Sequence, residues 1–308
     1  MADPGPVVFD EDPRLVMHTL GDESAGRVLA VLAGVHGDEP EGPLAASDLL
    51  RQLQGAPLRG AVRVVTVANP EAFANSSRCN PADGQNLARV FPGDPAGSPT
   101  ERLASWLREH LIRGADLLVD LHSAGTHYEM PMFVGYDAGA PEASTSELAA
   151  VAFGAPLIWR HPQVLPGRSL AAARELGVPA IYVEGSGGGR VRGGDLATYR
   201  TGLARLVACL GLLPATMPPA GPAQVLDGGD GNVDAMLDAE VDGFCVTFVE
   251  VGDHVSSGQV IAEVRTLEGG VAQVLHAPWP GRVMMLRRTA PLAVGEGIVM
   301  LAPLGVAA

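Results

Sequence analysis

The chain has 308 residues, 47% of them hydrophobic, and its 35 acidic residues against 21 basic ones give a formal net charge of −14 at pH 7. This length and composition suffice for one large domain and one small one, each with a buried core. Because a surface with such an excess of carboxylates repels other polyanions, the charge argues against nucleic acid and anionic membranes as partners.

The basic residues are all arginine, since the chain contains no lysine. That absence excludes Schiff-base catalysis, pyridoxal phosphate, a P-loop and lysine-linked biotin or lipoate. The three cysteines are odd in number and far apart, which indicates a reducing compartment rather than a disulfide framework. No apolar run approaches the roughly 20 residues of a membrane span, and the acidic, proline-broken start is unlike a secretory signal. We therefore expect a cytoplasmic protein.

Apolar runs alternate with helical patterns along residues 1–213. Two runs rich in β-branched residues, 26–34 and 61–69, flank a segment with helical spacing at 40–54, which is typical of a βαβ unit. Further buried strands are expected at 115–122, 130–136 and 179–185, and further helices at 99–112, 146–154, 168–177 and 193–211. The pattern predicts an α/β domain whose sheet is covered by helices on both faces.

The character of the sequence changes after Leu213. Residues 214–224 form a proline-rich linker, and residues 225–308 lack the pattern of a long helix. Short apolar or alternating runs at 243–264 and 277–286 lie between glycine turns, as strands of a small β-structure do. The sequence thus predicts a smaller, compact, all-β domain at the C-terminus.

Three potential metal ligands follow predicted strands. His36 and Glu39 lie in "GVHGDEPEG", just past the strand at 26–34, where open α/β sheets gather their ligand-binding groups. A histidine and a carboxylate three residues apart in such a turn can point to one side and supply two of the three protein ligands of a catalytic zinc. His122, at the end of the strand at 115–122, supplies the third. The His-x-x-Glu spacing alone is equally compatible with a capped helix entry and a solvated glutamate.

Two further segments carry residue types found in active sites. Residues 69–93 make a long polar loop that contains Arg78 and Arg89, and long loops inside compact domains are usually functional. The alternative is a surface loop fixed by its arginines. Glu184 ends the strand at 179–185 and precedes glycines that permit close approach of a ligand. Its carboxylate can act as a general base, or it is simply a charged residue at the sheet margin.

Taken together and in this order, these segments resemble the motifs of the succinylglutamate desuccinylase/aspartoacylase family, relatives of the zinc carboxypeptidases. The matching stretches are "GVHGDEPEG", "NPEAF", "RCNPADGQNLARVFPG", "DLHSAG" and "VEGSGGG". The resemblance covers nearly the whole chain and implies a zinc carboxypeptidase-like α/β fold with a mixed sheet. It also implies a C-terminal β-domain similar to a biotinyl/lipoyl carrier domain that lacks the attachment lysine.

The resemblance implies a role for each candidate residue. One zinc ion per chain is held by His36, Glu39 and His122. Glu184 is the general base and acid, and Arg78 polarises the scissile carbonyl. We therefore expect zinc-dependent hydrolysis of an amide bond in a small N-acyl amino acid or N-acyl amine, with metal-bound water as the nucleophile.

The chain departs from the family pattern in the segment implied to bind substrate. The family commonly has "LNR" where this chain has "NLAR", so Ala88 replaces an asparagine that would help Arg89 hold a substrate carboxylate. Asn86 is the nearest remaining candidate for that contact. Either Arg89 binds the carboxylate alone, or the substrate is an N-acyl amine without one. All four tyrosines lie at or before Tyr199, so a tyrosine contact that some family members take from the β-domain would have to come from the first domain.

Two other functions stay open: a metallocarboxypeptidase acting on peptides, and a non-catalytic scaffold that binds metal or metabolite. The presence of Glu184 and Arg78 favours an enzyme, because a scaffold needs neither a base nor an oxyanion donor beside a metal. A β-domain packed over the pocket would favour small substrates over peptides. A homo-oligomer is compatible with the sequence, and His161 is expected at the surface end of a strand.

Overall fold

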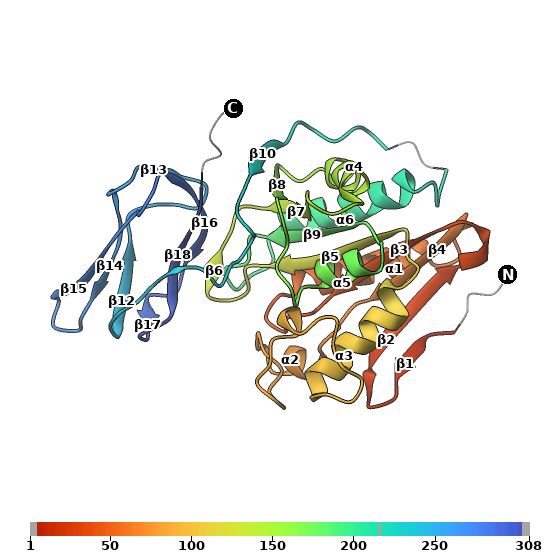
Figure 1. Cartoon of the computed structure of the whole chain (residues 1–308), viewed down its shortest axis with the longest axis horizontal. Coiled ribbons are helices and arrows are strands. Elements are labelled where there is room, and N and C mark those ends of the chain that lie inside the picture. Colours follow the sequence, from red (N-terminus) through yellow and green to blue (C-terminus); the bar gives the residue numbers. More distant parts are fainter. Residues whose placement is uncertain (1–4, 215–216, 304–308) are drawn as a thin grey trace.

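The computed structural model of the chain describes residues 5–214 and 217–303. A large α/β part is followed by a smaller part made of strands alone (Figure 1). Residues 215–216 of the predicted linker, and the outer ends 1–4 and 304–308 of the two predicted domains, lie outside the described residues. None of the helices within the described ranges has the length and apolar character needed to cross a membrane.

The large part is built on a nine-stranded mixed sheet, which confirms the predicted fold class. Its spatial order is β1, β2, β4, β3, β5, β9, β7, β8, β10. The central strands β4, β3, β5 and β9 run parallel, whereas β1, β2 and the β9–β7 pair are antiparallel. The strands are Val7–Phe9 (β1), Asp12–Gly21 (β2), Arg27–Ala33 (β3), Gly60–Val65 (β4), Leu117–Ser123 (β5), Phe133–Asp137 (β7), Leu157–His161 (β8), Ala180–Gly185 (β9) and Gln224–Asp227 (β10).

Helices cover both faces of this sheet. One face carries Glu41–Leu53 (α1), Ala143–Phe153 (α4) and Gly193–Cys209 (α6). The other carries Pro70–Ala74 (α2), Pro99–Leu107 (α3) with its π-helical continuation Arg108–Ile112 (η3), and Ser169–Glu175 (α5). Two short 3₁₀ turns complete the set, Glu23–Ala25 (η1) and Leu87–Arg89 (η2).

The start of α3 shows how local sequence sets these boundaries. The Ser98 hydroxyl accepts a hydrogen bond from the Glu101 backbone N–H, the Glu101 carboxylate accepts one from the Ser98 backbone N–H, and Pro99 occupies the first turn. This reciprocal arrangement satisfies two backbone donors that a helix start leaves without partners.

The C-terminal part is a sandwich of two antiparallel sheets around its own core. One sheet has the order β11, β18, β16, β13, and the other has the order β15, β14, β12, β17. The strands are Leu237–Asp238 (β11), Gly243–Thr247 (β12), His254–Val255 (β13), Val260–Arg265 (β14), Val271–His276 (β15), Gly281–Arg287 (β16), Pro291–Leu292 (β17) and Gly297–Pro303 (β18). The all-β character predicted from the sequence is therefore present.

The boundary between the two parts differs from the predicted one. The sequence places residues 225–308 in the C-terminal domain, whereas Val225–Asp227 belong to β10, which pairs in parallel with β8 at the edge of the large sheet. Three residues do not show a periodicity that distinguishes an edge strand from the start of a β-domain. The division into two domains with a linker at 214–224 otherwise stays a prediction.

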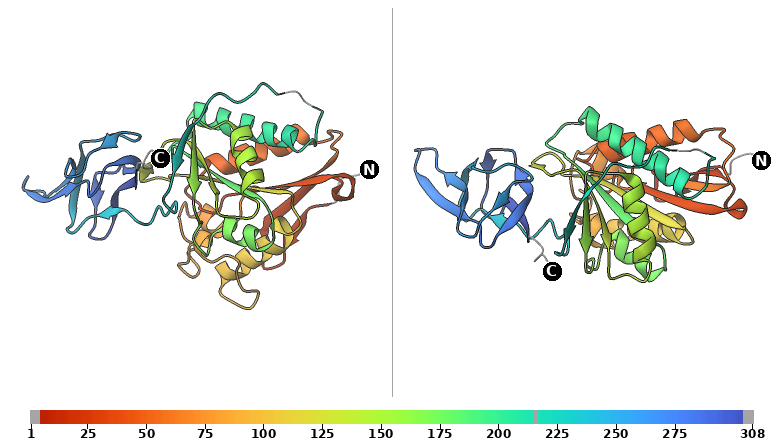
Figure 2. Two further views of the ribbon diagram at one scale, coloured as in Figure 1. Left: turned by 45° about the horizontal axis from the view of Figure 1, so that its top comes forward. Right: turned by 90° about the horizontal axis from the view of Figure 1, so that it is seen from above.

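The two parts share a strand pair and an apolar cluster. The short strand Tyr128–Glu129 (β6) leaves the large part and pairs with β16. Met284 and Met285 of β16 pack with Trp159 and Leu226 of the large part. Both views in Figure 2 show the C-terminal strands at one end of the large part. The side of β16 that faces the large part therefore lies close to the carboxyl ends of β5 and β9.

Candidate active site

The candidate site lies where three neighbouring parallel strands of the large sheet end. His36 follows the end of β3, and His122 and Glu184 are the last residues but one of β5 and β9. Strand β5 pairs with β3 on one side and with β9 on the other, and His122 lies directly beside Glu184 in the register. Ligand sites in open α/β sheets gather at such carboxyl ends because the loops that follow the strands meet there.

Two glycines make the turn after β3 possible. Gly34 has a φ of +66°, and a Cβ at this position would lie 2.8 Å from Val67 Cα. A Cβ at Gly37 would lie 1.9 Å from the carbonyl oxygen of Ala72. No larger residue fits either position without moving backbone. The chain can therefore fold back tightly enough to place the side chains of His36 and Glu39 together.

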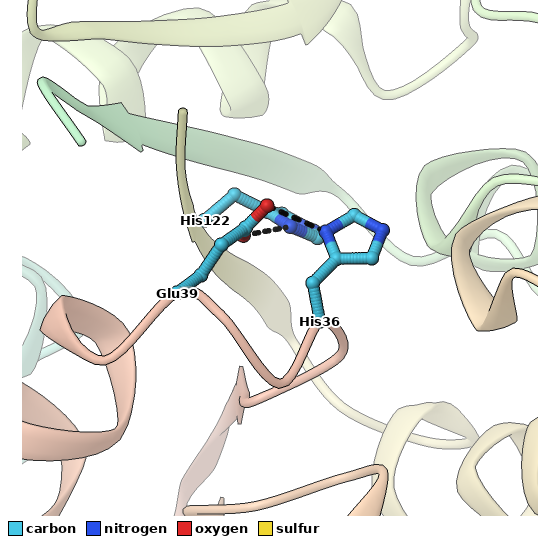
Figure 3. A group of neighbouring side chains, drawn as sticks. All are labelled: His36, Glu39 and His122. Atoms are coloured by element: carbon cyan, nitrogen blue, oxygen red, sulfur yellow. Dashed lines mark hydrogen bonds and ion pairs between the residues drawn. The ribbon is translucent and has the colours of Figure 1, made fainter. Parts of the chain in front are cut away.

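His36, Glu39 and His122 form a cluster that can hold a metal ion (Figure 3). Glu39 Oε1 lies 2.7 Å from His36 Nδ1, and Glu39 Oε2 lies 3.0 Å from His122 Nδ1. One potential ligand atom from each residue lies within 4.8 Å of the other two, and all three residues are buried. Two imidazole nitrogens with one carboxylate oxygen are a donor set that zinc favours.

The far nitrogens of the two imidazoles each face an oxygen acceptor. His36 Nε2 lies 3.0 Å from Asn86 Oδ1, and His122 Nε2 lies 3.1 Å from Asp120 Oδ1. Asp120 also accepts a hydrogen bond from Ser169 Oγ. An acceptor at Nε2 favours the tautomer with its hydrogen on Nε2, which leaves the lone pair of Nδ1 for a cation. The residues around the cluster therefore fit a bound metal.

The carboxyl of Glu39 is held in its ionised form. Burial opposes the charge, but His36 and His122 lower the pKa of Glu39 well below its ordinary value. The backbone N–H of Ser123 donates a further hydrogen bond of 3.0 Å to Glu39 Oε2. An ionised, buried carboxylate between two imidazole nitrogens attracts a cation.

Glu184 lies near this cluster, but the pKa of its carboxyl is shifted in the opposite direction to that of Glu39. Burial raises the pKa of its carboxyl to about 8, although the nearby His122 acts to lower it. A carboxyl whose pKa lies near neutral pH can both accept and release a proton. Glu184 thus has the electrostatic character of a group that transfers protons.

Arg78 brings a guanidinium to the same place from the loop that follows α2. Its Nη1 lies 3.4 Å from both His36 Nδ1 and Glu39 Oε1. A hydrogen bond of 2.8 Å from Gly37 N to Ser77 O ties the loop to the turn that carries His36. The positive charge of Arg78 is therefore fixed at the edge of the cluster.

A pocket encloses these groups. It contains about 680 Å³ of space, open solvent at its mouth included. Of the candidate residues predicted from the sequence, the following line it: His36, Glu39, Arg78, Arg89, His122 and Glu184. Asn86 lies behind His36 and outside the lining. Met285 of β16 forms part of the wall, so the C-terminal part contributes to the pocket.

Arg89 lines the pocket, but other residues of the protein engage its guanidinium. Its Nε and Nη2 donate to the two carboxylate oxygens of Asp234 over 2.7 and 3.0 Å, and its Nη1 donates to Ala88 O over 3.0 Å. Asn86 Oδ1 accepts a hydrogen bond of 2.9 Å from Ala88 N and so caps η2. A contact of Arg89 or Asn86 with substrate stays a prediction.

The expectation that His161 lies at the surface is wrong. His161 is fully buried at the end of β8, where β10 and the loop after it cover the strand end. Its Nε2 lies 2.7 Å from the Tyr182 hydroxyl and its Nδ1 lies 3.4 Å from Gly229 O. Both aromatic residues line the pocket, and so does Arg168, which the sequence did not single out. No local pattern marks these side chains, because partners distant in the sequence bring them to the site.

The burial of His161 gives the fold a dependence on pH. Burial lowers the pKa of His161 to about 4, so below about pH 6.5 the unfolded chain binds a proton that the folded chain does not. The free energy of unfolding should therefore fall as the pH is lowered, by about 2–3 kcal/mol from this residue between pH 7 and pH 4.5. Urea unfolding of the wild type and of His161→Gln at both pH values measures this. The acid loss should be smaller in the variant, and equal losses would contradict the assignment; His110→Gln, at an exposed histidine, is the control.

The comparison with protein families and characterised proteins agrees with this geometry. Residues 25–210 match the model of the succinylglutamate desuccinylase/aspartoacylase catalytic domain. The N-alpha-acetyl-L-2,4-diaminobutyric acid deacetylase of Halomonas elongata is 31% identical over 291 residues, which is 92% of this chain and 84% of that protein.

Solved structures show the same similarity over almost the whole chain. A succinylglutamate desuccinylase from Silicibacter sp. TM1040 superposes with a TM-score of 0.84 at 26% identity, covering 96% of this chain and 92% of that one. The product-bound ectoine utilization protein EutE (DoeB) from Ruegeria pomeroyi gives a TM-score of 0.83 at 26% identity with the same coverage. The extent of the family match and the identity to the Halomonas enzyme lead to one conclusion. The chain belongs to the succinylglutamate desuccinylase/aspartoacylase family.

Proposed function

We propose that this protein is a zinc-dependent deacylase that hydrolyses the amide bond of a small N-acyl amino acid. The observation that carries the proposal is the buried cluster of His36, Glu39 and His122, which opens into a pocket shared with Glu184 and Arg78. Membership of a family of deacylases and the activity of the Halomonas relative support the same reaction class.

Zinc suits the cluster because its donor set is two nitrogens and one oxygen, each on a buried side chain. When bound there by His36, Glu39 and His122, zinc would supply Lewis acidity that activates water and polarises a carbonyl at neutral pH. Asn86 and Asp120 would hold the two imidazoles in the ligating orientation through their Nε2 atoms. We expect one zinc ion per chain.

Glu184 is the residue that we assign to proton transfer. Its carboxylate accepts a proton from the attacking water and then delivers that proton to the departing amine, so that no amide anion has to leave. The pKa of about 8 that burial confers on Glu184 suits both halves of this exchange. Its position beside His122 across the β5–β9 pair puts it at the edge of the cluster.

Arg78 stabilises the negative charge that develops on the carbonyl oxygen of the substrate. Its Nη1 lies 3.4 Å from both His36 Nδ1 and Glu39 Oε1, so the guanidinium is already beside the cluster before substrate binds. A fixed donor at a developing oxyanion lowers the barrier because its charge is oriented before the reaction begins.

Replacing Arg78 tests this assignment. Arg78→Ala should lower kcat by about a hundredfold to a thousandfold, the usual effect of removing one oxyanion donor. Steady-state kinetics on an N-acetyl amino acid, with zinc content measured in parallel, would check it. Arg51→Ala removes an arginine that is 76% exposed on α1 and serves as the control. A kcat within a factor of three of the wild type would exclude Arg78 from the reaction.

The substrate proposed is a single N-acyl amino acid rather than a peptide. Met285 from the C-terminal part and Val233 from the loop before it narrow the space around the cluster. Arg168 lines the same pocket, where its Nη2 donates a hydrogen bond of 3.2 Å to Asn232 Oδ1 and lies 4.0 Å from Asp234 Oδ2. Its guanidinium is therefore better placed than Arg89 to receive the carboxylate of the amino acid.

The reaction itself is tested with the zinc-loaded protein and a chromatographic screen of N-acetyl, N-succinyl and N-formyl amino acids and of N-acyl diamines. Release of a free amine from at least one N-acyl amino acid supports the proposal. Release from short peptides alone would favour the metallocarboxypeptidase, and binding without turnover would favour the scaffold. Assembly into a homo-oligomer and a cytoplasmic location stay predictions.

A further inference from the structure

We propose that Asp230 selects substrates whose amino acid portion carries a side-chain ammonium group, and that Asp234 disfavours substrates with a second carboxylate. Both residues lie in the connector loop, residues 228–236, between β10 and β11. The inference rests on the proposed deacylase function and adds to it the class of amine that the pocket accepts.

The connector loop is attached to the pocket wall on both sides of Asp230. Before it, Gly228 O accepts a hydrogen bond of 2.7 Å from Trp159 Nε1. After it, Asn232 Oδ1 accepts the hydrogen bond from Arg168, and Asp234 binds Arg89 through two hydrogen bonds. Side chains held in this way lose little conformational freedom when a ligand binds.

Gly231 brings the loop backbone against the aromatic wall of the pocket. A Cβ at this position would lie 2.8 Å from His161 Cε1 and 3.0 Å from the Tyr182 hydroxyl, and the φ of Gly231 is +65°. A larger residue would therefore push the loop away from His161 and Tyr182. The tight fit places the neighbouring Asp230 in the pocket lining.

Asp230 is a carboxylate whose charge acts on the nearby Arg168 guanidinium, although the two side chains form no ion pair. Its Oδ1 accepts a hydrogen bond of 2.9 Å from Asn232 N, and it makes no ion pair with any of the residues in 5–214 and 217–303. The aromatic groups near it, His161 and Tyr182, are both neutral around pH 7, since burial lowers the pKa of His161 and raises that of Tyr182. An ammonium group of the substrate would form with Asp230 the direct ion pair that Arg168 does not form.

Asp234 makes the pocket less favourable for a second carboxylate of the substrate. Its two oxygens take up Nε and Nη2 of Arg89, and Ala88 O takes up Nη1. A substrate with a second carboxylate would have to displace Asp234 to reach that guanidinium. One carboxylate can instead bind Arg168, which lines the same pocket and whose Nη2 lies 4.0 Å from Asp234 Oδ2. The arrangement thus fits an amino acid with one carboxylate and one ammonium group besides the acylated nitrogen.

The test compares two ligands that differ only in the ammonium group. We would measure binding of L-2,4-diaminobutyrate and of L-2-aminobutyrate to the zinc-loaded protein by calorimetry, and kcat/KM for their N-α-acetyl derivatives. In the wild type the diamino ligand should bind about tenfold to a hundredfold more tightly, as expected for one charge-assisted hydrogen bond. Asp230→Asn should abolish most of that preference in both measurements.

Asp227→Asn is the matched control, because it removes the same charge three residues earlier, from an exposed side chain that pairs with Arg160 outside the pocket lining. Its preference for the diamino ligand should equal that of the wild type. Asp234→Asn tests the second half of the proposal, and it should raise kcat/KM for N-acetyl-L-aspartate relative to the diamino substrate by about tenfold.

Equal affinity of the wild type for the two amine ligands, or an unchanged preference in Asp230→Asn, would overturn the assignment of Asp230. That result can coexist with efficient hydrolysis of both acetyl derivatives, in which case the deacylase proposal stands and the specificity proposal fails. The converse outcome is also distinct. A preference for the diamino ligand without turnover of any N-acyl amino acid would support Asp230 as the binding residue and refute the deacylase.

Discussion

Glu184→Gln is expected to fold, to retain its zinc and to lose about a thousandfold in kcat. The amide keeps the shape of the carboxyl and can still accept a hydrogen bond, but it cannot take a proton from water or give one to the leaving amine. General acid and base catalysis contributes about a hundredfold to ten-thousandfold, and Glu184 is assigned both roles. Single-turnover and steady-state kinetics at saturating substrate, with metal analysis and circular dichroism, would measure the effect.

A second buried glutamate provides the matched control. Glu41 is 1% exposed, burial raises the pKa of its carboxyl, and it accepts a hydrogen bond of 2.7 Å from Ser123 Oγ. Glu41 lies outside the pocket lining. Glu41→Gln should therefore show the effect on folding of replacing a buried carboxyl, while kcat stays close to that of the wild type. If Glu184→Gln retained more than a tenth of the wild-type kcat, the proton-transfer role would be refuted.

Metal removal should abolish activity completely and reversibly. The purified protein is expected to contain about one zinc per chain, and dialysis against a chelator followed by zinc should remove and restore turnover. His122→Ala should lower the zinc content to background, because it deletes one of three ligands and leaves Glu39 facing a single imidazole. Elemental analysis and an activity assay on the same samples would check both results.

The control for this variant is an exposed histidine in the loop that follows β5. His127→Ala removes an imidazole five residues further along the chain, outside the cluster and the pocket lining, and should leave zinc content unchanged. Full zinc content in His122→Ala would show that the metal is bound elsewhere. Activity that survived complete removal of metal would refute a metal-dependent reaction.

The central strands and the candidate metal-binding residues could be predicted because their signals are local. Strands β3, β5 and β9 are mainly apolar and almost entirely buried, and such runs stand out in the sequence. The residues that follow such strands come together once the strands are parallel neighbours. His36, Glu39 and His122 were therefore predicted to meet, and the structure places them in one cluster.

The edges of the sheet were not predicted, because their signals are short or broken. Burial alternates along β2 from Leu15 to Leu20, but the sequence of this stretch, LVMHTL, does not alternate apolar and polar residues. Strand β1 is only Val7–Phe9, and β10 is only Gln224–Asp227. The predicted strand 130–136 is shorter in the structure, where β7 begins only at Phe133 and a separate strand, β6, ends at Glu129. Pro131 lies in the gap, and proline cannot donate a hydrogen bond to a neighbouring strand.

The partners of the predicted arginines could not be read from the sequence either. Arg89 and Asp234 are 145 positions apart, so their ion pair depends on how β10 and the connector loop return to the large sheet. The same return buries His161 and brings Arg168 within reach of Asn232. Local periodicity contains no information on such contacts, and the substrate specificity that we propose depends on them.

Since Met285 on β16 and residues of the connector loop both line the pocket, we expect the thermal stability of the proposed active site to depend on the smaller, C-terminal part. The β-sandwich has a smaller core than the nine-stranded part, so it buries a smaller fraction of its surface. Its free energy of unfolding is therefore expected to be the smaller of the two. On warming, catalysis would cease when β16 separates from β6, while the nine-stranded sheet and the cluster at its centre are still folded. Thermal half-life would then respond to substitutions in the β-sandwich more than to those in the large core.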